Sequence, residues 1–407
     1  MDILIEEFEE NIWVAALEKG RLEGLEVDPI GENVRWGSIY WAKVTRIDTK
    51  QDAVFLDLDG DHEGILYNKD VRYHDKDGNV KKGGERAISK TLHAGDMIAV
   101  QAKSTYIEQG DDTLWGYENK ATQTSMDITL PGRYLIFGAM MKNNRISSRI
   151  RGKKQREQML KMIDALEDMK GFILRSAAAD MQTEILRREA NILKNIWLQI
   201  EQYFEGKTPS LIALGPDSIQ RTLSDKAMNP IERIEIVTMD HFSQVEDWCT
   251  VFAPDLVTKI TPIELEDAAQ DLALFDYRDI LGQIESLLHD YVMLQTGSNI
   301  IIQETTALTA IDVNSSSDKR SHLSINIDAA KEIARQMRLR NLGGIVVIDF
   351  LKMNKADEKT LLNTLNDQTY LDPCTVQIHG FTKLGLMEIT RKRRTAPLLE
   401  RFEGIEF

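Results

Sequence analysis

The sequence predicts a multidomain α/β protein, and three observations lead to this prediction. Its 407 residues are too many for one ordinary hydrophobic core, so about two to four domains are expected. From Gly37 onward, short apolar segments alternate with glycine and charged clusters, which favours a small closed β-barrel. After Asn299, apolar strands alternate with long helical patterns, which is typical of an α/β domain.

The composition is that of a globular protein, with 42% hydrophobic and 28% charged residues. No apolar stretch approaches the roughly 20 residues that a membrane helix needs. The start, MDILIEEFEE, is acidic where a secretory signal would be basic and then apolar. Cys249 and Cys374 lie far apart and form no CxxC, so neither a disulfide framework nor a zinc site is indicated. We therefore expect a cytoplasmic protein with no membrane insertion.

The formal net charge is −15, yet positive charge is concentrated in two places. Between residues 142 and 156 there are seven basic residues and no acidic one: Lys142, Arg145, Arg149, Arg151, Lys153, Lys154 and Arg156. A second block covers residues 391–394. Such runs indicate either a local site for a polyanion or ordinary solvated faces.

The N-terminal half follows from local patterns. Apolar residues alternate at Ile3, Ile5 and Phe8 and continue over 13–17, which predicts strands joined by a turn at 18–20. The barrel strands are expected within 37–48, 52–67 and 94–107. A further short β region is expected over 128–150. Helical spacing over 159–169 and 185–200 predicts two helices that flank a strand at 171–178.

The C-terminal half is read in the same way. We expect a strand at 231–238 and an amphipathic helix around 275–295. Two strands are expected over residues 299–315. A helix is expected over 328–344, where Gly343 and Gly344 end it. A buried strand at 345–350, a helix at 356–368 and a final strand at 375–381 complete the chain.

Three polar residues follow apolar strands in this last region. The segment ALTAIDVNS ends a strand with Asp312 and Asn314, and side chains two apart on a strand share one face. Asp349 follows the apolar run 345–348. Ligands bind at the carboxyl ends of strands in open α/β sheets. Two carboxylates and an amide suit Mg²⁺, with Mn²⁺ as the alternative. Aspartates at strand ends also cap turns, and that reading stays open.

The motifs ALTAIDVNS, EIARQMRLRNLGGIVVIDF and GLMEITRKR, in this order, resemble the catalytic region of the ribonuclease E/G family. The resemblance implies that Asp312 and Asp349 hold magnesium and that Asn314 supports the site. It also implies that an ion-activated water attacks an RNA phosphodiester in line and leaves a 5′-phosphate.

The resemblance also implies an architecture. A ribonuclease H-like unit is divided into residues 1–36 and 222–287. Inserted in it are an S-one-like OB-fold barrel at 37–125 and a 5′-monophosphate sensor region at 126–221. A DNase I-like catalytic domain follows at 288–407.

Further site residues are carried over by the same resemblance. Phe55 matches a base-stacking position, although the alternating pattern around it also allows a core role. The resemblance also implies RNA contacts at Lys120 and Arg149, and the basic block at 391–394 adds Arg391 and Arg393 as expected contacts. Arg175 and Ser176 match the Arg-Thr pair that grips the 5′-phosphate, where the serine keeps a hydroxyl donor. Gly132 and Ile136 match the backbone positions that complete that pocket.

The chain also departs from the family pattern. Ile65 replaces a second stacking aromatic, and Ser148 and Thr375 stand where arginines are common. The CPxC-type pair that links subunits through zinc does not occur, so no zinc link is expected and any homo-oligomer would form differently.

The function expected is a magnesium-dependent endoribonuclease acting on single-stranded RNA, such as mRNA and rRNA precursors, with a preference for 5′-monophosphorylated ends. The alternative is a catalytically weak RNA-binding accessory protein of RNA metabolism. A structural α/β protein is a third reading.

Overall fold

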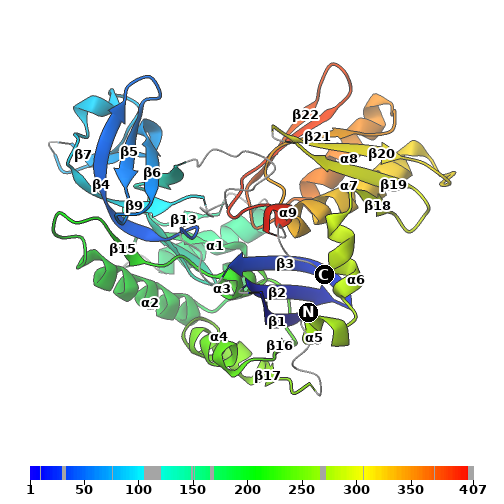
Figure 1. Ribbon diagram of the computed structural model, residues 1–407, viewed down its shortest axis with the longest axis horizontal. Coiled ribbons are helices and arrows are strands. Elements are labelled where there is room, and N and C mark those ends of the chain that lie inside the picture. The colour runs from blue at the N-terminus through cyan, green and yellow to red at the C-terminus, as the bar shows by residue number, and fades with distance from the viewer. Residues whose placement is uncertain are drawn as a thin grey trace. The chain divides into compact units, whose positions relative to one another are not determined.

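The computed structural model describes residues 1–9, 11–29, 34–75, 77–104, 121–147, 150, 152–165, 169–265, 272–305, 307–370 and 372–401 (Figure 1). The chain divides into two compact units. Unit 1 contains residues 1–29, 231–244 and 259–407, and unit 2 contains residues 30–230 and 245–258. Each unit is therefore discontinuous in sequence.

The first sheet of unit 1 begins with an antiparallel meander. The apolar run over 13–17 is buried on both faces of the second strand: Trp13, Ala15 and Leu17 point into one core, and Val14 and Ala16 are buried as well. The strand order is β17-β16-β1-β2-β3, and β16 lies parallel to both β1 and β17. The strands are β1 (Asp2–Phe8), β2 (Asn11–Glu18), β3 (Arg21–Pro29), β16 (Arg233–Ile236) and β17 (Ile260–Pro262). The predicted strand at 231–238 is thus confirmed as β16.

The predicted helix around 275–295 is wrong. The chain instead forms α5 (Ala273–Tyr277), α6 (Leu281–Glu285) and the strand β18 (Tyr291–Met293). Asp279 has a φ of 54°, a left-handed conformation that ends a right-handed helix between α5 and α6. The carboxylate of Glu6 accepts hydrogen bonds from the backbone N–H groups of Leu274 and Phe275, which holds the start of α5 against β1.

The second sheet of unit 1 has the order β18-β19-β20-β21-β23-β22. Only the β20–β21 pair is parallel, because α7 crosses over between those two strands. The remaining elements are β19 (Asn299–Glu304), β20 (Thr309–Asn314), α7 (His322–Leu339), β21 (Gly344–Asp349), α8 (Lys355–Gln368), β22 (Val376–Phe381), β23 (Met387–Arg391) and α9 (Leu398–Arg401). β22 was predicted as the final strand, and β23, which pairs between β21 and β22, was missed.

One face of this second sheet forms a hydrophobic core with α7 and α8 (Figure 1). Ile311, Val313, Val346 and Ile348 point into that core together with Ile333 of α7. The intervening residues of β20 and β21 point to the opposite face. This alternation decides which side chains the sheet presents to solvent.

Unit 2 contains a closed five-stranded barrel, consistent with an OB-like fold and with the β-barrel prediction. The strands run β4-β5-β6-β10-β9, and β9 pairs again with β4. β15 extends the sheet from β4. The elements are β4 (Ile39–Asp48), β5 (Ala53–Asp57), β6 (Glu63–Tyr67), β9 (Met97–Ala102), β10 (Thr122–Ser125) and β15 (Ser210–Ala213), with a hairpin of β7 (Arg72–His74) and β8 (Val80–Lys82) beside them.

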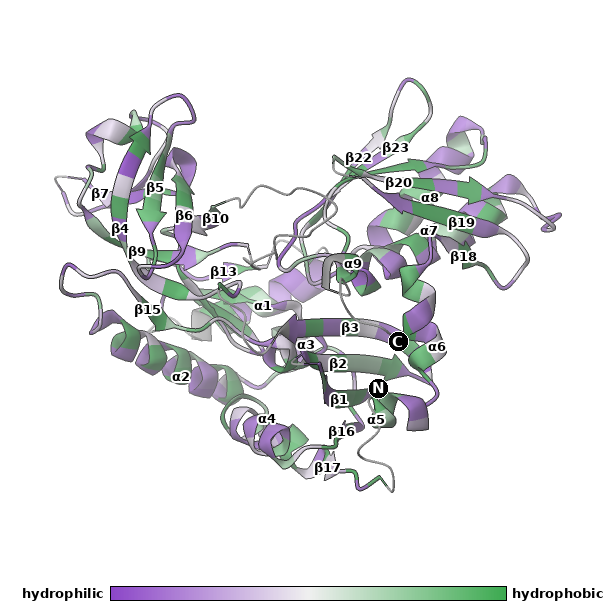
Figure 2. Cartoon of the chain, viewed as in Figure 1, coloured by the Kyte–Doolittle hydropathy of each residue, from purple (hydrophilic) through white to green (hydrophobic). Residues whose placement is uncertain are grey.

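The rest of unit 2 is built on a small sheet of order β11-β12-β14-β13. These strands are β11 (Thr129–Pro131), β12 (Leu135–Gly138), β13 (Arg145–Ile146) and β14 (Phe172–Leu174). The helices are α1 (Lys153–Ala165), α2 (Thr183–Glu201), α3 (Ser218–Asp225) and α4 (Met239–Phe252), the last of which begins in unit 1. Apolar and polar residues alternate along α2 in Figure 2, and Leu186, Ala190 and Leu193 form its buried stripe. The two helices predicted to flank β14 are confirmed.

The mixed α/β class and the barrel therefore agree with expectation. The ribonuclease H-like and DNase I-like arrangements, and the domain boundaries drawn from them, stay predictions.

Candidate functional site

The two predicted metal ligands lie side by side on neighbouring strands. In the parallel register of β20 and β21, Asp312 stands directly opposite Asp349. Their neighbours Ile311 and Ile348 point into the core, so both carboxylates leave the sheet on its open face. Both aspartates are exposed. A cation in solution, or a bound substrate, can therefore reach both carboxylates at once.

Asn314 lies on the same face of β20 and interacts directly with Asp312. Its side-chain Nδ2 donates a hydrogen bond of 2.8 Å to Oδ2 of Asp312. This contact fixes the orientation of the carboxylate, in the way that outer ligands position metal-bound groups. The amide thus acts on Asp312 rather than facing Asp349.

The donor set fits a hard divalent cation. Across the part of the chain that the structure describes, no three His, Cys, Asp or Glu side chains form a metal-binding group. Two carboxylates and an amide are an oxygen-only set, and magnesium commonly uses one or two carboxylates and keeps several waters. A magnesium ion at Asp312 and Asp349 is chemically consistent with these residues.

A positioning residue was missed by sequence reasoning. Asn326, fully buried in α7, donates to the backbone O of Leu351 at 2.8 Å and accepts from its N–H at 3.1 Å. These two hydrogen bonds clamp the segment just after Asp349 to α7. The signal in the sequence was an asparagine beside Ile325 in the apolar stripe of a helix, where a polar side chain needs a specific partner.

On the barrel, Phe55 lies in β5 and is half-buried. The guanidinium of Arg46 lies 3.6 Å from the centre of its ring, a cation–π contact. Ile65 stands directly opposite on β6 and is buried. Phe55 is therefore partly exposed, and the guanidinium of Arg46 lies over its ring. The predicted contact Lys120 lies outside the described residues.

The predicted 5′-phosphate residues come together around Arg175. Its guanidinium donates to the backbone O of Gly132 at 2.9 Å and to Oδ1 of Asp225 at 3.0 Å. Ser176 follows directly in the chain, and Ile136 lies in β12, which pairs with the strand that leads to Arg175. Asp225 at the end of α3 was not expected. A phosphate at Arg175 would have to compete with this carboxylate.

Glu189 organises the turn that carries Gly132. Its Oε1 accepts hydrogen bonds of 2.9 Å from the backbone N–H groups of both Tyr134 and Leu135. Burial raises the pKa of Glu189, although these two hydrogen bonds and the nearby Arg175 act in the other direction. A Cβ at position 132 would lie 2.2 Å from Oε1 of Glu189, which explains the glycine there. This buried acid in an otherwise amphipathic helix was also missed.

The second basic block, residues 391–394, contains both buried and exposed arginines. Arg391 was predicted to contact RNA, but it ends β23, which lies between β21 and β22, and is 3% exposed. Its guanidinium pairs with Asp372 at 2.9 Å and donates to the backbone O of Leu342. This prediction is therefore wrong, because an interior guanidinium cannot reach a polyanion. Arg393 is exposed and runs along Gly343. Arg149 lies outside the described residues.

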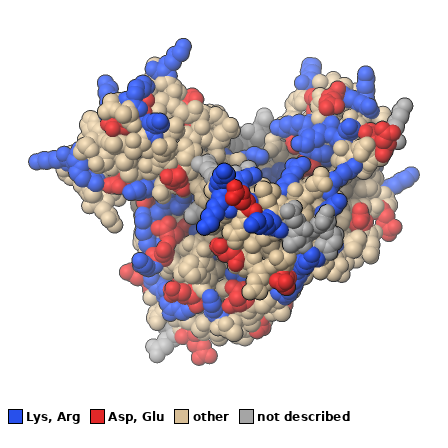
Figure 3. All heavy atoms as spheres, turned by 180° about the vertical axis from the view of Figure 1, so that it is seen from behind, with Lys and Arg blue, Asp and Glu red and all other residues tan. Residues whose placement is uncertain are grey.

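Charge of both signs is interspersed on the face of the molecule shown in Figure 3. Lysines and arginines lie close to aspartates and glutamates there, despite the net charge of −15. The net charge therefore does not describe the local surface that a nucleic acid would meet.

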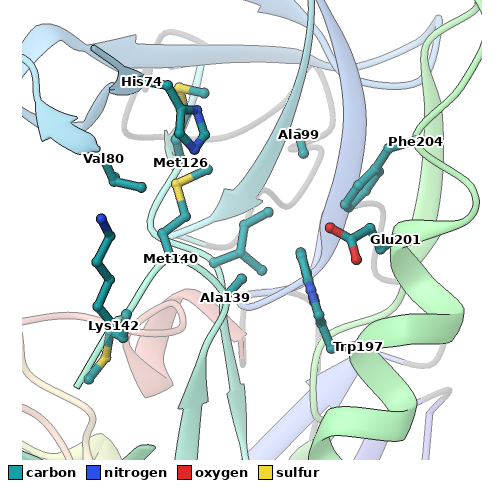
Figure 4. A pocket seen from close by; sticks show the side chains of 12 residues that line it. His74, Val80, Ala99, Met126, Ala139, Met140, Lys142, Trp197, Glu201 and Phe204 are labelled. Carbon is teal, nitrogen blue, oxygen red and sulfur yellow. The ribbon is translucent and has the colours of Figure 1, made fainter. Parts of the chain in front are cut away.

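A cavity of about 340 Å³ lies in unit 2, and none of the predicted site residues lines it (Figure 4). Trp197, Glu201 and Phe204, at the end of α2, form one wall, and Lys142 lies on the other. Met126 and Ile128 also line the cavity and are buried. Lys142 donates to Oδ1 of Asn79 at 2.9 Å. The cavity is mainly apolar and has a charged rim.

An OB-like barrel and a sheet that presents paired carboxylates are compatible with an enzyme that processes nucleic acid. The sequence model of the Ribonuclease E/G family matches residues 129–394, about two thirds of the chain. The chain belongs to this family and is an endoribonuclease by class.

Comparisons with individual relatives agree with this family assignment. The chain is 30% identical over 392 residues to Ribonuclease G of Haemophilus influenzae, covering 93% of this chain and 77% of that protein. It is 28% identical over 389 residues to Ribonuclease G of Escherichia coli K12, with the same coverage. It is 31% identical over 406 residues to Ribonuclease E of Haemophilus influenzae, but covers only 41% of that longer protein. Among the described residues, none of the helices is long and apolar enough to cross a membrane.

Proposed function

We propose that this endoribonuclease requires magnesium and hydrolyses phosphodiester bonds of single-stranded RNA, leaving 5′-phosphate ends. The observation that supports it most is the direct register pairing of Asp312 with Asp349 on an exposed sheet face. A protein that only bound RNA would gain nothing from two carboxylates facing an anionic ligand, because like charges repel. An ion between the carboxylates removes that conflict.

In this proposal Asp312 and Asp349 hold the ion. When bound, magnesium lowers the pKa of a coordinated water and offsets the charge that develops on the phosphodiester. Asn314 keeps the carboxylate of Asp312 in one orientation through its 2.8 Å hydrogen bond. Asn326 holds the backbone that follows Asp349. The chain's own contribution is therefore two charges placed on rigid strands, each with a dedicated support.

The preference for 5′-monophosphorylated RNA forms the second part of the proposal. A terminal phosphate would accept hydrogen bonds from Arg175 and Ser176, since a guanidinium can grip a phosphate with two parallel bonds. The hydrogen bond from the Arg175 guanidinium to the backbone O of Gly132 supports this role, because it brings two of the predicted pocket residues together. A bound phosphate would compete with Asp225 for the Arg175 guanidinium. We also propose that its substrates are mRNA and rRNA precursors and that it acts in the cytoplasm.

The decisive experiment is cleavage of a 5′-monophosphorylated, single-stranded A/U-rich RNA. The wild type, Asp312→Asn and Asp349→Asn would be compared in magnesium and in EDTA. Asp367→Asn is a matched control, because Asp367 is an exposed aspartate on α8, the helix against the opposite face. We expect cleavage only by the wild type and the control, and only with magnesium.

RNA binding would be measured in parallel by fluorescence anisotropy. We expect both site variants to retain it, since each loses one negative charge and no RNA contact. Full cleavage by either site variant would remove the metal assignment. Binding without cleavage by the wild type would favour the alternative, a catalytically weak RNA-binding accessory protein.

A further inference from the structure

The open face of the second sheet in unit 1 presents apolar side chains next to the paired carboxylates. Val292 of β18 packs against the helix-covered core, so its neighbours Tyr291 and Met293 point to the open face. Tyr291 is 48% exposed and Met293 is 63% exposed. Large apolar groups at this exposure on a sheet face are candidates for ligand contact.

The strand register places Tyr291 in line with the candidate site. Tyr291 stands opposite Ile301, Ile301 opposite Asp312, and Asp312 opposite Asp349. The four side chains therefore form one row across the open face. Neighbouring strands lie roughly 4.8 Å apart, so Tyr291 is about 10 Å from Asp312 along this row.

The tyrosine is held along the sheet edge. Its hydroxyl donates to the sulfur of Met293 at 3.7 Å. Both residues belong to a short strand paired to β19, so the ring sits on a fixed backbone. A ring held in this way loses little conformational entropy when a planar ligand stacks on it.

The chemistry of the row favours a base over a phosphate. Tyr291 and Ile301 in the row are uncharged, as is Met293 beside them, and the next residue in the row is the carboxylate of Asp312. A phosphate placed at Tyr291 would find no positive charge among these side chains, whereas the flat face of any base can stack on an aromatic ring. Methionine sulfur also contacts aromatic rings favourably.

We propose that Tyr291 and Met293 form a base-stacking subsite for the nucleotide next to the scissile phosphate, and this rests on the proposed function. The subsite orients the RNA strand along the row, so that the phosphodiester lies over Asp312 and Asp349. The specificity it confers is for an unpaired base, because a base inside a duplex cannot offer its face to the ring.

The test uses single-stranded RNA oligonucleotides that carry an abasic nucleotide at successive positions along the strand. Binding would be measured with Asp349→Asn, which isolates binding from cleavage, in three backgrounds: Tyr291 retained, Tyr291→Ala and Tyr291→Phe. With Tyr291 retained, one abasic position should weaken binding on the order of tenfold. With Tyr291→Ala the intact RNA should bind weakly, and that abasic position should cost nothing more. Tyr291→Phe should restore the wild-type pattern.

Tyr277→Ala in the same Asp349→Asn background is the matched control, since Tyr277 is 69% exposed on α5 and lies in a different part of unit 1. An abasic penalty that persists unchanged in Tyr291→Ala would overturn the subsite. A change in the sedimentation coefficient of Tyr291→Ala, without any change in the abasic penalty, would also overturn it and identify the face as a contact between copies. Because binding is read without cleavage, failure of the proposed hydrolysis would not be mistaken for failure of the subsite.

Discussion

Asp312 and Asp349 are register partners on the parallel strands β20 and β21, although 36 residues separate them in sequence. The helix α7 makes this pairing, because it returns the chain along the sheet and lets β21 run in the same direction as β20. Asn314 then ties the first carboxylate in place. The consequences of this arrangement and of its surroundings can be tested individually.

The first prediction concerns Asn314. Asn314→Ala removes the hydrogen bond to Asp312 but leaves both carboxylates, so magnesium affinity should fall about 10- to 100-fold. Cleavage should therefore drop at low magnesium and recover as magnesium is raised. The measurement is cleavage rate against magnesium concentration. A loss of activity that no magnesium concentration restores would mean that Asn314 acts directly on the substrate.

The second prediction concerns Arg175 and Asp225. Arg175→Ala should reduce the preference for 5′-monophosphorylated over 5′-triphosphorylated RNA, because the phosphate loses its guanidinium. Asp225→Asn should strengthen that preference, because the competing carboxylate becomes neutral. The ratio of kcat/KM for the two RNAs measures both effects, with melting curves to confirm that each variant folds. Identical ratios in wild type and both variants would show that no sensor operates here.

The third prediction is a pH dependence at Glu189. Burial raises the pKa of Glu189 in the folded protein, so the folded state binds the proton more tightly than the unfolded state does. The contribution of Glu189 to stability is therefore present below its ordinary pKa and is lost as pH rises through the raised value. Glu189→Gln cannot ionise, so its stability relative to wild type should increase across that window.

The measurement is the free energy of unfolding of both proteins in urea at several pH values. Glutamine retains an acceptor oxygen for the N–H groups of Tyr134 and Leu135, which makes the comparison close to isosteric. A difference between the two proteins that does not vary with pH would contradict the assignment.

The fourth prediction separates two neighbouring arginines. Arg391→Ala should destabilise the fold by about 3–5 kcal/mol, because it leaves the carboxylate of Asp372 buried without its partner. Arg393→Ala should cost less than Arg391→Ala, because the Arg393 side chain is exposed and leaves no buried carboxylate behind. Urea unfolding measures both. Equal stability of the two variants would mean that Arg391 is not the interior ion pair described above.

The local patterns predicted much of the secondary structure. β20, β21, α7 and α8 follow from apolar periodicity, and the barrel strands follow from short apolar segments between turns. The region around Asp279 was mispredicted because its apolar spacing fits a helix, while a single left-handed residue interrupts it. β23 was missed because its pairing partners, β21 and β22, are not specified by its own residues.

By itself, the sequence determined the residue types of the candidate site and the strands that carry them, because periodicity and strand-end positions are local properties. Tertiary structure alone decided which of those side chains meet. It paired Asp312 with Asp349, placed Asp225 against Arg175, and buried Arg391 against Asp372. Each of these contacts depends on how strands and helices distant in sequence pack, and packing is a property of the whole core rather than of any one segment.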